Sequence, residues 1–444
     1  MHGKIQIAVV LLVFGTVSTL CAQEALPSSP DSPVDLSIEK AVSSALAENN
    51  TILRQRITLS AAKRRAAFSW NSISPSLSLS GGGTIPDGKA VTDSTISMEG
   101  KISVLLMPDI AFSVQKAWRD YEAEKISYDT TILSIEGNVR SAYLTLLYEQ
   151  ENIRLQNRNL ETARSQYEQN LQRYQLGSVS ELDMLSSRVT WERLKPRVQE
   201  ASVTYDADKA LFLQLIGLDQ HTDVRLQGAL SSYAEQYSGF TSEKNMNKIT
   251  AILSGETAPS ILAAAKKLEA AKTALTKSRL NAYGPSVTAA WSYAPAIVHT
   301  GASKSVQDTG SLSLGVSVPL DSWLPWSAGR ETVSSAKDTA ADLELTLEEA
   351  RDSVQIQAAN CIRRISQKEK SIQFQNTNIK LAEQSYRMAL DAYLKGSKDL
   401  LSLQNASNTL LEAEVTLESD MLDYVKTCIE LEQLLGIPYG TLSE

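Results

Sequence analysis

Histidine and cysteine are almost absent from this chain of 444 residues, which has three of each. The histidines, His2, His221 and His299, lie far apart in the sequence. Metal centres and catalytic relays usually need several such side chains close together. No nucleophile is spaced with a base either. The composition therefore indicates a protein that is not an enzyme and that holds no metal or other cofactor.

Glycine, proline and aromatic residues are also few: 21 glycines, 13 prolines and 6% aromatics. This composition favours long helices. Beyond the N-terminus there is no run of about 18 apolar residues, so no transmembrane helix is expected. The net charge of -8 lacks the basic excess that nucleic-acid binding requires, so nucleic acid is not an expected partner.

The N-terminus has the pattern of a secretory signal peptide, with one lysine, an apolar run over Ile5–Phe14 and small residues after it. Residues 1–22 are therefore predicted to be removed after Ala22, and a lipoprotein anchored through Cys21 is the alternative. Residues 23–34 are rich in Pro and Ser and are expected to be a flexible leader. The mature chain keeps two cysteines, in an oxidising compartment.

One stretch occurs twice. Tyr167–Gly217 aligns without a gap on Tyr386–Gly436, with 11 of 51 positions identical. Each copy predicts a helix, a break at Tyr-x-x-Gly-Ser and a returning helix that ends at a glycine, the residue that commonly ends helices in the left-handed conformation. The chain therefore contains a duplicated antiparallel helical hairpin.

The same plan extends to both halves. Residues 35–217 form the first repeat, 258–436 the second, 218–257 an irregular connector at the equator and 437–444 a C-terminal tail. In the first repeat we expect a helix from Ser37 to about Ser72, two strands, a helix of about 65 residues and a return helix. In the second repeat the same order starts at Pro259.

Four segments alternate apolar and polar residues, and each has the length of a tilted strand that crosses a bilayer. Thr95–Val104 is the clearest of them. Four strands cannot close a barrel, and an open sheet edge is not tolerated in lipid. A membrane barrel would therefore need at least two chains that contribute four strands each. The aromatic residues near strand ends fit interfacial anchors: Trp291, Tyr293, Trp323 and Trp326. A half-buried sheet on a soluble domain is the alternative.

The order of elements, their duplication and the two tip motifs Arg173–Ser178 and Ala392–Ser397 resemble the TolC-type outer-membrane efflux protein family. The resemblance implies a mainly α-helical homotrimer. Its 12-stranded β-barrel in the outer membrane would continue into a long α-helical barrel in the periplasm. It also implies a passive exit duct for small molecules or proteins, served by an inner-membrane transporter and a periplasmic adaptor protein.

The resemblance also assigns residues at the tips. Asp183, Tyr393 and Lys398 match residues of the family's closable aperture, whereas Ser402 and Asn405 stand where the family has acidic residues. A strong cation-binding ring is therefore not expected. A cap and ordinary packing are the simpler explanation for a Gly and a Tyr at such a turn. The implied adaptor-docking residues are Tyr174, Leu176, Gly177, Ser178, Lys395, Gly396 and Ser397.

Two alternative functions are a periplasmic adaptor and a helical scaffold without a membrane barrel. An adaptor would carry one hairpin between other modules, and a scaffold would not need four alternating strands. The hairpin geometry makes one further prediction. Cys361 precedes Gly396 by 35 residues and Cys428 follows it by 32, so the two cysteines should lie at one height. Whether they are free thiols or a disulfide stays open.

Overall fold

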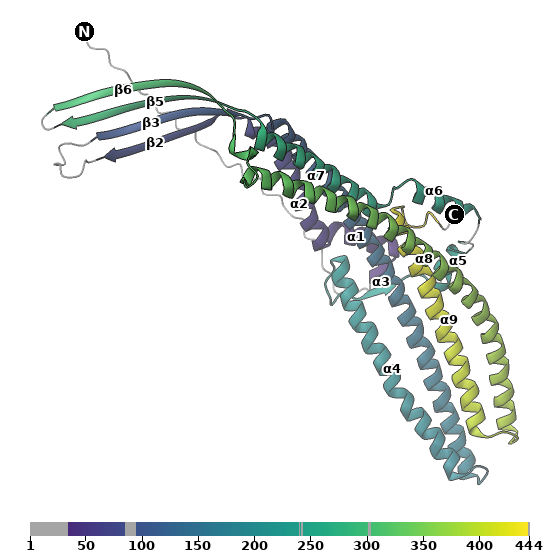
Figure 1. Cartoon of the computed structure of the whole chain (residues 1–444). Coiled ribbons are helices and arrows are strands. Elements are labelled where there is room, and N and C mark those ends of the chain that lie inside the picture. Colours follow the sequence, from purple (N-terminus) through teal and green to yellow (C-terminus); the bar gives the residue numbers. More distant parts are fainter. Residues whose placement is uncertain (1–33, 85–94, 239, 241–242, 301–302, 443–444) are drawn as a thin grey trace.

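The computed structural model describes residues 34–84, 95–238, 240, 243–300 and 303–442. The predicted signal peptide, Cys21 and all but the last residue of the leader lie outside this range. The molecule is elongated, with strands at one end and two helical hairpins at the other (Figure 1). Within the described ranges, no helix is both long enough and apolar enough to cross a membrane.

The two repeats have the same order of elements, as predicted. The first contains α1 (Ile38–Glu48), α2 (Asn50–Ala67), β2 (Ser76–Thr84), β3 (Thr95–Leu106), α3 (Ile110–Gln175) and α4 (Glu181–Ile216). The second contains α7 (Pro259–Tyr283), β5 (Ser286–Thr300), β6 (Ser303–Ser317), α8 (Ala328–Leu394) and α9 (Leu400–Leu435). A short 3-10 turn precedes β2, at Ser69–Ser72, and another follows β6, at Asp321–Trp323.

The helix expected from Ser37 to Ser72 is interrupted, so that prediction was wrong in detail. Ser37 caps α1 as expected, with its side chain accepting the Lys40 N–H. Asn49 then leaves the helical conformation. Its Oδ1 accepts the Thr51 N–H at 2.8 Å and its amide donates to the Leu215 carbonyl oxygen at 2.8 Å. This side chain therefore starts α2 and ties it to the end of α4.

The four long strands form one antiparallel sheet in the order β2-β3-β5-β6. The two repeats meet at the β3–β5 pair, where Ile102 lies opposite Trp291. β2 and β6 are the sheet edges, and large apolar side chains such as Leu77 and Leu314 are 79% and 76% exposed. A single chain therefore offers an open, apolar sheet with two unpaired edges.

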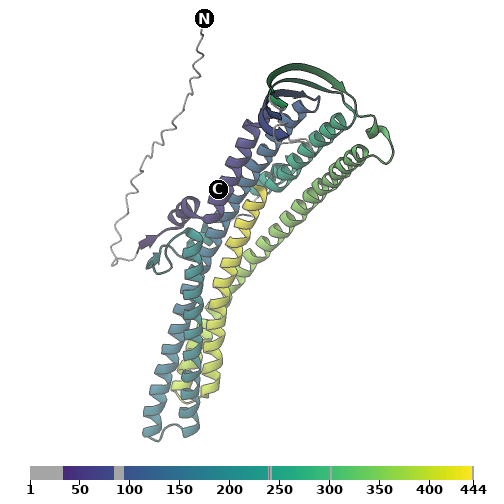
Figure 2. The ribbon, with the colours of Figure 1, turned by 90° about the vertical axis from the view of Figure 1, so that its left-hand side faces the viewer.

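The helices form a curved wall, in which α4, α3, α9 and α8 lie side by side (Figure 1). We call the level of the connector, residues 218–257, the equator. On its strand side, α2 packs on α3, while α7 packs on α3 and α8. Figure 2 shows the wall from the side. α3 has 66 residues and α8 has 67, which gives each a length of about 100 Å.

The connector over 218–257 is not irregular, and this expectation is corrected. It contains β4 (Val224–Leu226), α5 (Leu230–Gln236) and α6 (Glu243–Ser254). β4 pairs in parallel with β1 (Val34–Leu36), so the end of the supposed flexible leader is a strand. The Tyr143 hydroxyl donates to the Gln227 carbonyl oxygen at 2.6 Å and accepts a hydrogen bond from the Gln227 N–H at 3.0 Å. These elements are too short to give a readable period.

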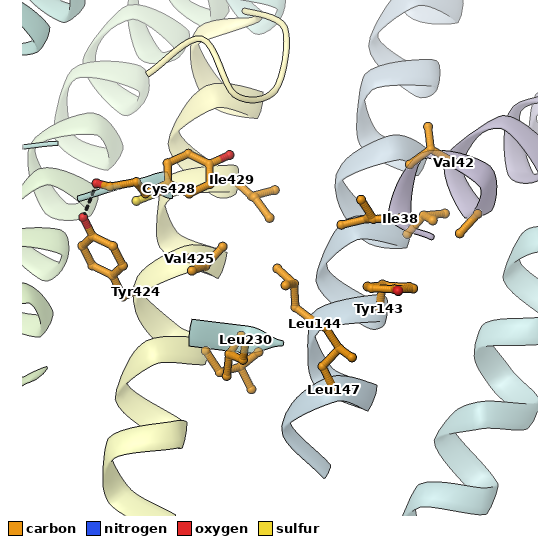
Figure 3. Packing of buried hydrophobic residues seen from close by; sticks show 14 of the residues in the cluster. Ile38, Val42, Tyr143, Leu144, Leu147, Leu230, Tyr424, Val425, Cys428 and Ile429 are labelled. Atoms are coloured by element: carbon orange, nitrogen blue, oxygen red, sulfur yellow. Dashed lines mark hydrogen bonds between the residues drawn. The ribbon is translucent and has the colours of Figure 1, made fainter. Parts of the chain in front are cut away.

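The main hydrophobic core lies at this equatorial level (Figure 3). Val425 and Ile429 of α9 face Leu144 of α3, and Leu230 of α5 lies between the two helices. Two further core residues, Cys361 and Cys428, are buried free thiols. Burial raises the pKa of Cys361 to about 11, so this thiol stays protonated at neutral pH.

The predicted tail is packed against the core over Ile437–Leu442. The buried Glu432 carboxylate accepts the N–H groups of Gly440 and Leu442, both at 3.0 Å. The Tyr439 hydroxyl donates to the Leu133 carbonyl oxygen at 2.6 Å. The end of the chain therefore ties α9 to α3.

Candidate functional site

Each hairpin tip begins with the same helix-ending turn. In the first, the Gly177 N–H donates to the Tyr174 carbonyl oxygen at 2.9 Å and the Ser178 N–H to that of Arg173 at 2.8 Å. The second repeats this pattern one repeat later. Gly177 and Gly396 have φ of 70° and 73°, and a Cβ at either would meet nothing within 4 Å. The backbone conformation, not crowding, therefore favours glycine.

Both return helices start with a bonded pair of one Ser and one Asp, and the order of the two residues is reversed between the tips. Ser180 caps α4, accepts the Asp183 N–H at 3.2 Å and donates its hydroxyl to the Asp183 carboxylate at 2.7 Å. Asp399 caps α9 and bonds both the N–H and the hydroxyl of Ser402. These bonds hold the pKa of Asp399 below its usual value. Asp183 and Ser402, two predicted aperture residues, therefore occupy equivalent positions, each bonded to the capping residue of its helix.

Tyr393 joins the second tip to the first hairpin. Its hydroxyl donates to Oδ1 of Asn170 at 2.5 Å, and the Arg173 guanidinium lies over its ring at 5.6 Å. Arg173 also donates to the Leu394 carbonyl oxygen at 3.1 Å. Asn170 is only 1% exposed, so this contact between α3 and α8 is sheltered.

Sequence reasoning missed Asn170, and it used Arg173 only as part of the tip motif, without a role at the site. One signal could have found them, because their repeat equivalents are Ala389 and Ala392. Where one copy has a polar residue and the aligned position of the other copy has alanine, the two repeats make different contacts. The structure thus gives Tyr393, the residue expected at the aperture, two partners that Tyr174 lacks within the described residues.

The other predicted aperture residues do not meet Tyr393 within one chain. Asp183 bonds Ser180, and Lys398 is exposed at the end of the turn, directly before the α9 cap. Asn405 is exposed in the second turn of α9, and Ser402 is half-buried. A latch that joins Asp183, Tyr393 and Lys398 inside one chain is therefore not observed among the described contacts.

The predicted docking residues lie at the exposed end of the hairpins. Leu176 is 81% exposed and Tyr174 39%. Lys395 is held by an ion pair with Asp391 at 2.6 Å. Leu182 and Leu401, equivalent residues that were not predicted for docking, are 74% and 61% exposed. The tips therefore combine apolar and basic side chains around two open glycine turns.

The sequence pattern of outer membrane efflux proteins matches residues 41–215 and 253–437, which is most of the chain and both repeats. The chain belongs to the outer membrane efflux protein family. This confirms the resemblance drawn from the tip motifs and the duplication, and with it the outer membrane as the location. Among curated protein sequences, none matches the chain.

Several solved outer-membrane channels share the efflux-protein fold. VceC from Vibrio cholerae is 14% identical with a TM-score of 0.73, over 90% of this chain and 96% of VceC. CmeC from Campylobacter jejuni is 16% identical with a TM-score of 0.72, over 90% and 85% of the two chains. MtrE from Neisseria gonorrhoeae, in its open state, is 19% identical with a TM-score of 0.71, over 90% and 89%. At this identity the likeness establishes the fold.

Proposed function

We propose that this chain forms a homotrimeric exit duct. The duct conducts small molecules or proteins passively across the outer membrane, from a periplasmic adaptor protein and an inner-membrane transporter to the exterior. Three chains with four strands each give a closed barrel of 12 strands, which leaves no sheet edge in lipid. The family and the open edges of β2 and β6 support this proposal.

The observation that carries it is a matched pair of apolar stripes on the two edges of the helical wall. On α4, Leu182, Val189 and Val203 are 74%, 65% and 57% exposed. On α8, Met388, Leu381 and Phe374 are 66%, 61% and 74% exposed. In both stripes the residues are spaced by multiples of seven, the repeat of helices that pack along one another.

The stripes also match in height. Val189 follows its tip glycine by 12 residues, and Leu381 precedes its own by 15. The distances from the tip glycines differ by three residues for Leu182 and Met388, and by four residues for Val203 and Phe374. Both differences are about one helical turn. Because the stripes lie on opposite edges, the α4 edge of one chain can cover the α8 edge of the next. Head-to-tail contacts close into a ring when the rotation between neighbouring chains closes, and in the proposed trimer three such contacts complete it.

At the ring's narrow end, Tyr393 with Asn170 and Arg173 serves as the latch of the aperture. In this proposal Asp183 and Lys398 contact the neighbouring chain, and Ser402 and Asn405 line the opening. Without carboxylates at those two positions, the opening binds cations weakly. The tip residues Tyr174, Leu176, Gly177, Ser178, Lys395, Gly396 and Ser397 form the surface for the adaptor.

Cysteine crosslinking in membranes tests the assembly. With Cys361 and Cys428 replaced by Ala, Val189→Cys combined with Leu381→Cys should give covalent trimers with a short bismaleimide. Val189→Cys with Ile356→Cys is the matched control, because Ile356 is 60% exposed on α8 but about 38 Å higher. Equal crosslinking of both pairs, or none with the first, would contradict the ring. A monomer without conductance in planar bilayers would favour the adaptor or scaffold.

A further inference from the structure

Two segments of equal length contain neither Asp nor Glu, although the chain as a whole has a net charge of -8. They are residues 49–86 and 270–307. Both cover a similar part of their repeat: the first runs from the cap of α2 through β2, and the second runs from the middle of α7 through β5 into β6. Where α2 leads into β2 and α7 leads into β5, both repeats therefore lack negative charge, whereas Asp109 after β3 and Asp321 after β6 lie where the strands lead back into helices.

Basic side chains gather at this junction. Lys63, Arg64 and Arg65 are exposed at the end of α2, and Lys277 and Arg279 lie near the end of α7. Within the described residues, none of the five takes part in an ion pair or a side-chain hydrogen bond. By contrast, Lys272, further from the strands on α7, pairs with Glu344 at 2.8 Å. The charges nearest the strands are thus left available.

Exposed aromatic side chains lie at the same level. Phe68 and Trp70 follow α2 and are 58% and 55% exposed. Trp323 and Trp326 follow β6 and are 64% and 80% exposed. The Trp323 ring contacts that of Tyr283, the last residue of α7, with centroids 5.3 Å apart. We call these four aromatic and five basic residues the junction collar.

We propose that the junction collar binds anionic phospholipid headgroups in the periplasmic leaflet of the outer membrane. This rests on the proposed function, in which the strands cross the membrane and the helices stand in the periplasm. The collar then lies at the membrane surface, continuous with the exposed apolar strands (Figure 1). Tryptophan prefers that interface, and basic clusters beside a membrane anchor attract anionic lipid.

A simpler role for the basic residues is to offset the dipole at the ends of α2 and α7. That role explains charge in the last turn of a helix. It explains neither the absence of acids across β2 and β5 nor four large exposed aromatic rings. Binding to an anionic surface accounts for all three features.

Native mass spectrometry of the full-length protein tests the proposal, with phosphatidylglycerol and phosphatidylcholine present in equal amounts. The wild type should retain phosphatidylglycerol preferentially. Lys63→Gln/Arg64→Gln/Arg65→Gln should lower that preference by about tenfold or more. The matched control is Arg54→Gln/Arg56→Gln, two exposed residues on α2 about 15 Å further from the strands, which should change it little.

Equal retention of both lipids by the wild type would overturn the proposal, as would equal effects of the triple variant and its control. So would loss of the trimer in the triple variant without lipid, because the surface would then be a contact between subunits. Conductance in planar bilayers is measured separately. A wild type that does not conduct contradicts the duct, whereas its lipid preference is still read directly.

Discussion

The equator and the tips of the hairpins use the same helices in opposite ways. At the equator, Tyr143, Ile365 and Leu431 are fully buried. At the tips, Leu176, Leu182 and Leu401 are largely exposed. There Tyr393 connects α3 to α8 through one hydrogen bond and one cation–π contact. Regions with few buried contacts open at lower free energy, so the equator is the fixed part and the tips are the part able to move.

The helix-ending glycines show this difference within one motif. Gly217 and Gly436 end their helices in the same turn as the tip glycines, with φ of 78° and 71°. A Cβ at Gly217 would lie 2.5 Å from Cβ of Glu48, and one at Gly436 would lie 2.6 Å from Pro259. The equatorial turns are therefore packed against a neighbouring helix, while the tip turns are open.

The largest effect is expected from Glu432→Ala at the equator. The variant leaves the N–H groups of Gly440 and Leu442 and the Tyr237 hydroxyl, which donates at 3.1 Å, without their acceptor. The expected loss is about 3 kcal/mol or more in the free energy of unfolding. Thermal denaturation should show it. Glu430→Ala, which removes only an exposed ion pair, is the control, and equal melting temperatures would contradict the equator as the fixed part.

The next largest effect on stability is the difference expected between Gly436→Ala and Gly396→Ala. Both variants force alanine into a left-handed conformation, at a cost of about 1 kcal/mol. Only Gly436→Ala also drives a methyl group into Pro259, so we expect it to cost about 2 kcal/mol more. Similar melting temperatures for the two variants would contradict the tighter packing of the equatorial turn.

How much the sequence predicts also differs between the two regions. The tip turns and caps are local, so the Gly177 and Gly396 motifs could be placed from neighbouring residues alone. The equator depends on contacts across the chain. β1 pairs with β4, and Glu432 bonds a segment that contains no periodic pattern. Asn170, the partner of Tyr393, lies more than 200 residues before it, so only the repeat mismatch pointed to it.

A smaller effect on stability but a specific effect on conductance is expected from Tyr393→Phe. The variant loses the hydrogen bond to Asn170, worth about 1 kcal/mol, and should leave the melting temperature almost unchanged. Because few other described contacts join α3 to α8 at the tip, single-channel conductance in planar bilayers should rise. Tyr174→Phe is the matched control at the equivalent position, and an equal rise in both variants would remove the latch role from Tyr393.

The smallest effect concerns Glu149, on α3 between the equator and the tip. Burial, and next a hydrogen bond with Asp208, raise the pKa of Glu149 to about 7, while Lys426 partly lowers it. The folded state then binds this proton more tightly than the unfolded state. The free energy of unfolding therefore falls as pH rises from about 4.5 to about 7 and is unaffected outside that window.

Because Glu149 is only half-buried, solvent screening limits the change to about 1 kcal/mol. Glu149→Gln should be as stable as the wild type at pH 5 and slightly more stable at pH 8, as measured by thermal denaturation. Glu168→Gln, which changes an exposed carboxylate on the same helix, should leave the pH dependence as it is. If the wild type and Glu149→Gln lose stability in parallel from pH 5 to pH 8, Glu149 does not titrate there. The surroundings of Glu149, two residues beyond the buried Leu147, would then be as open to water as the tips.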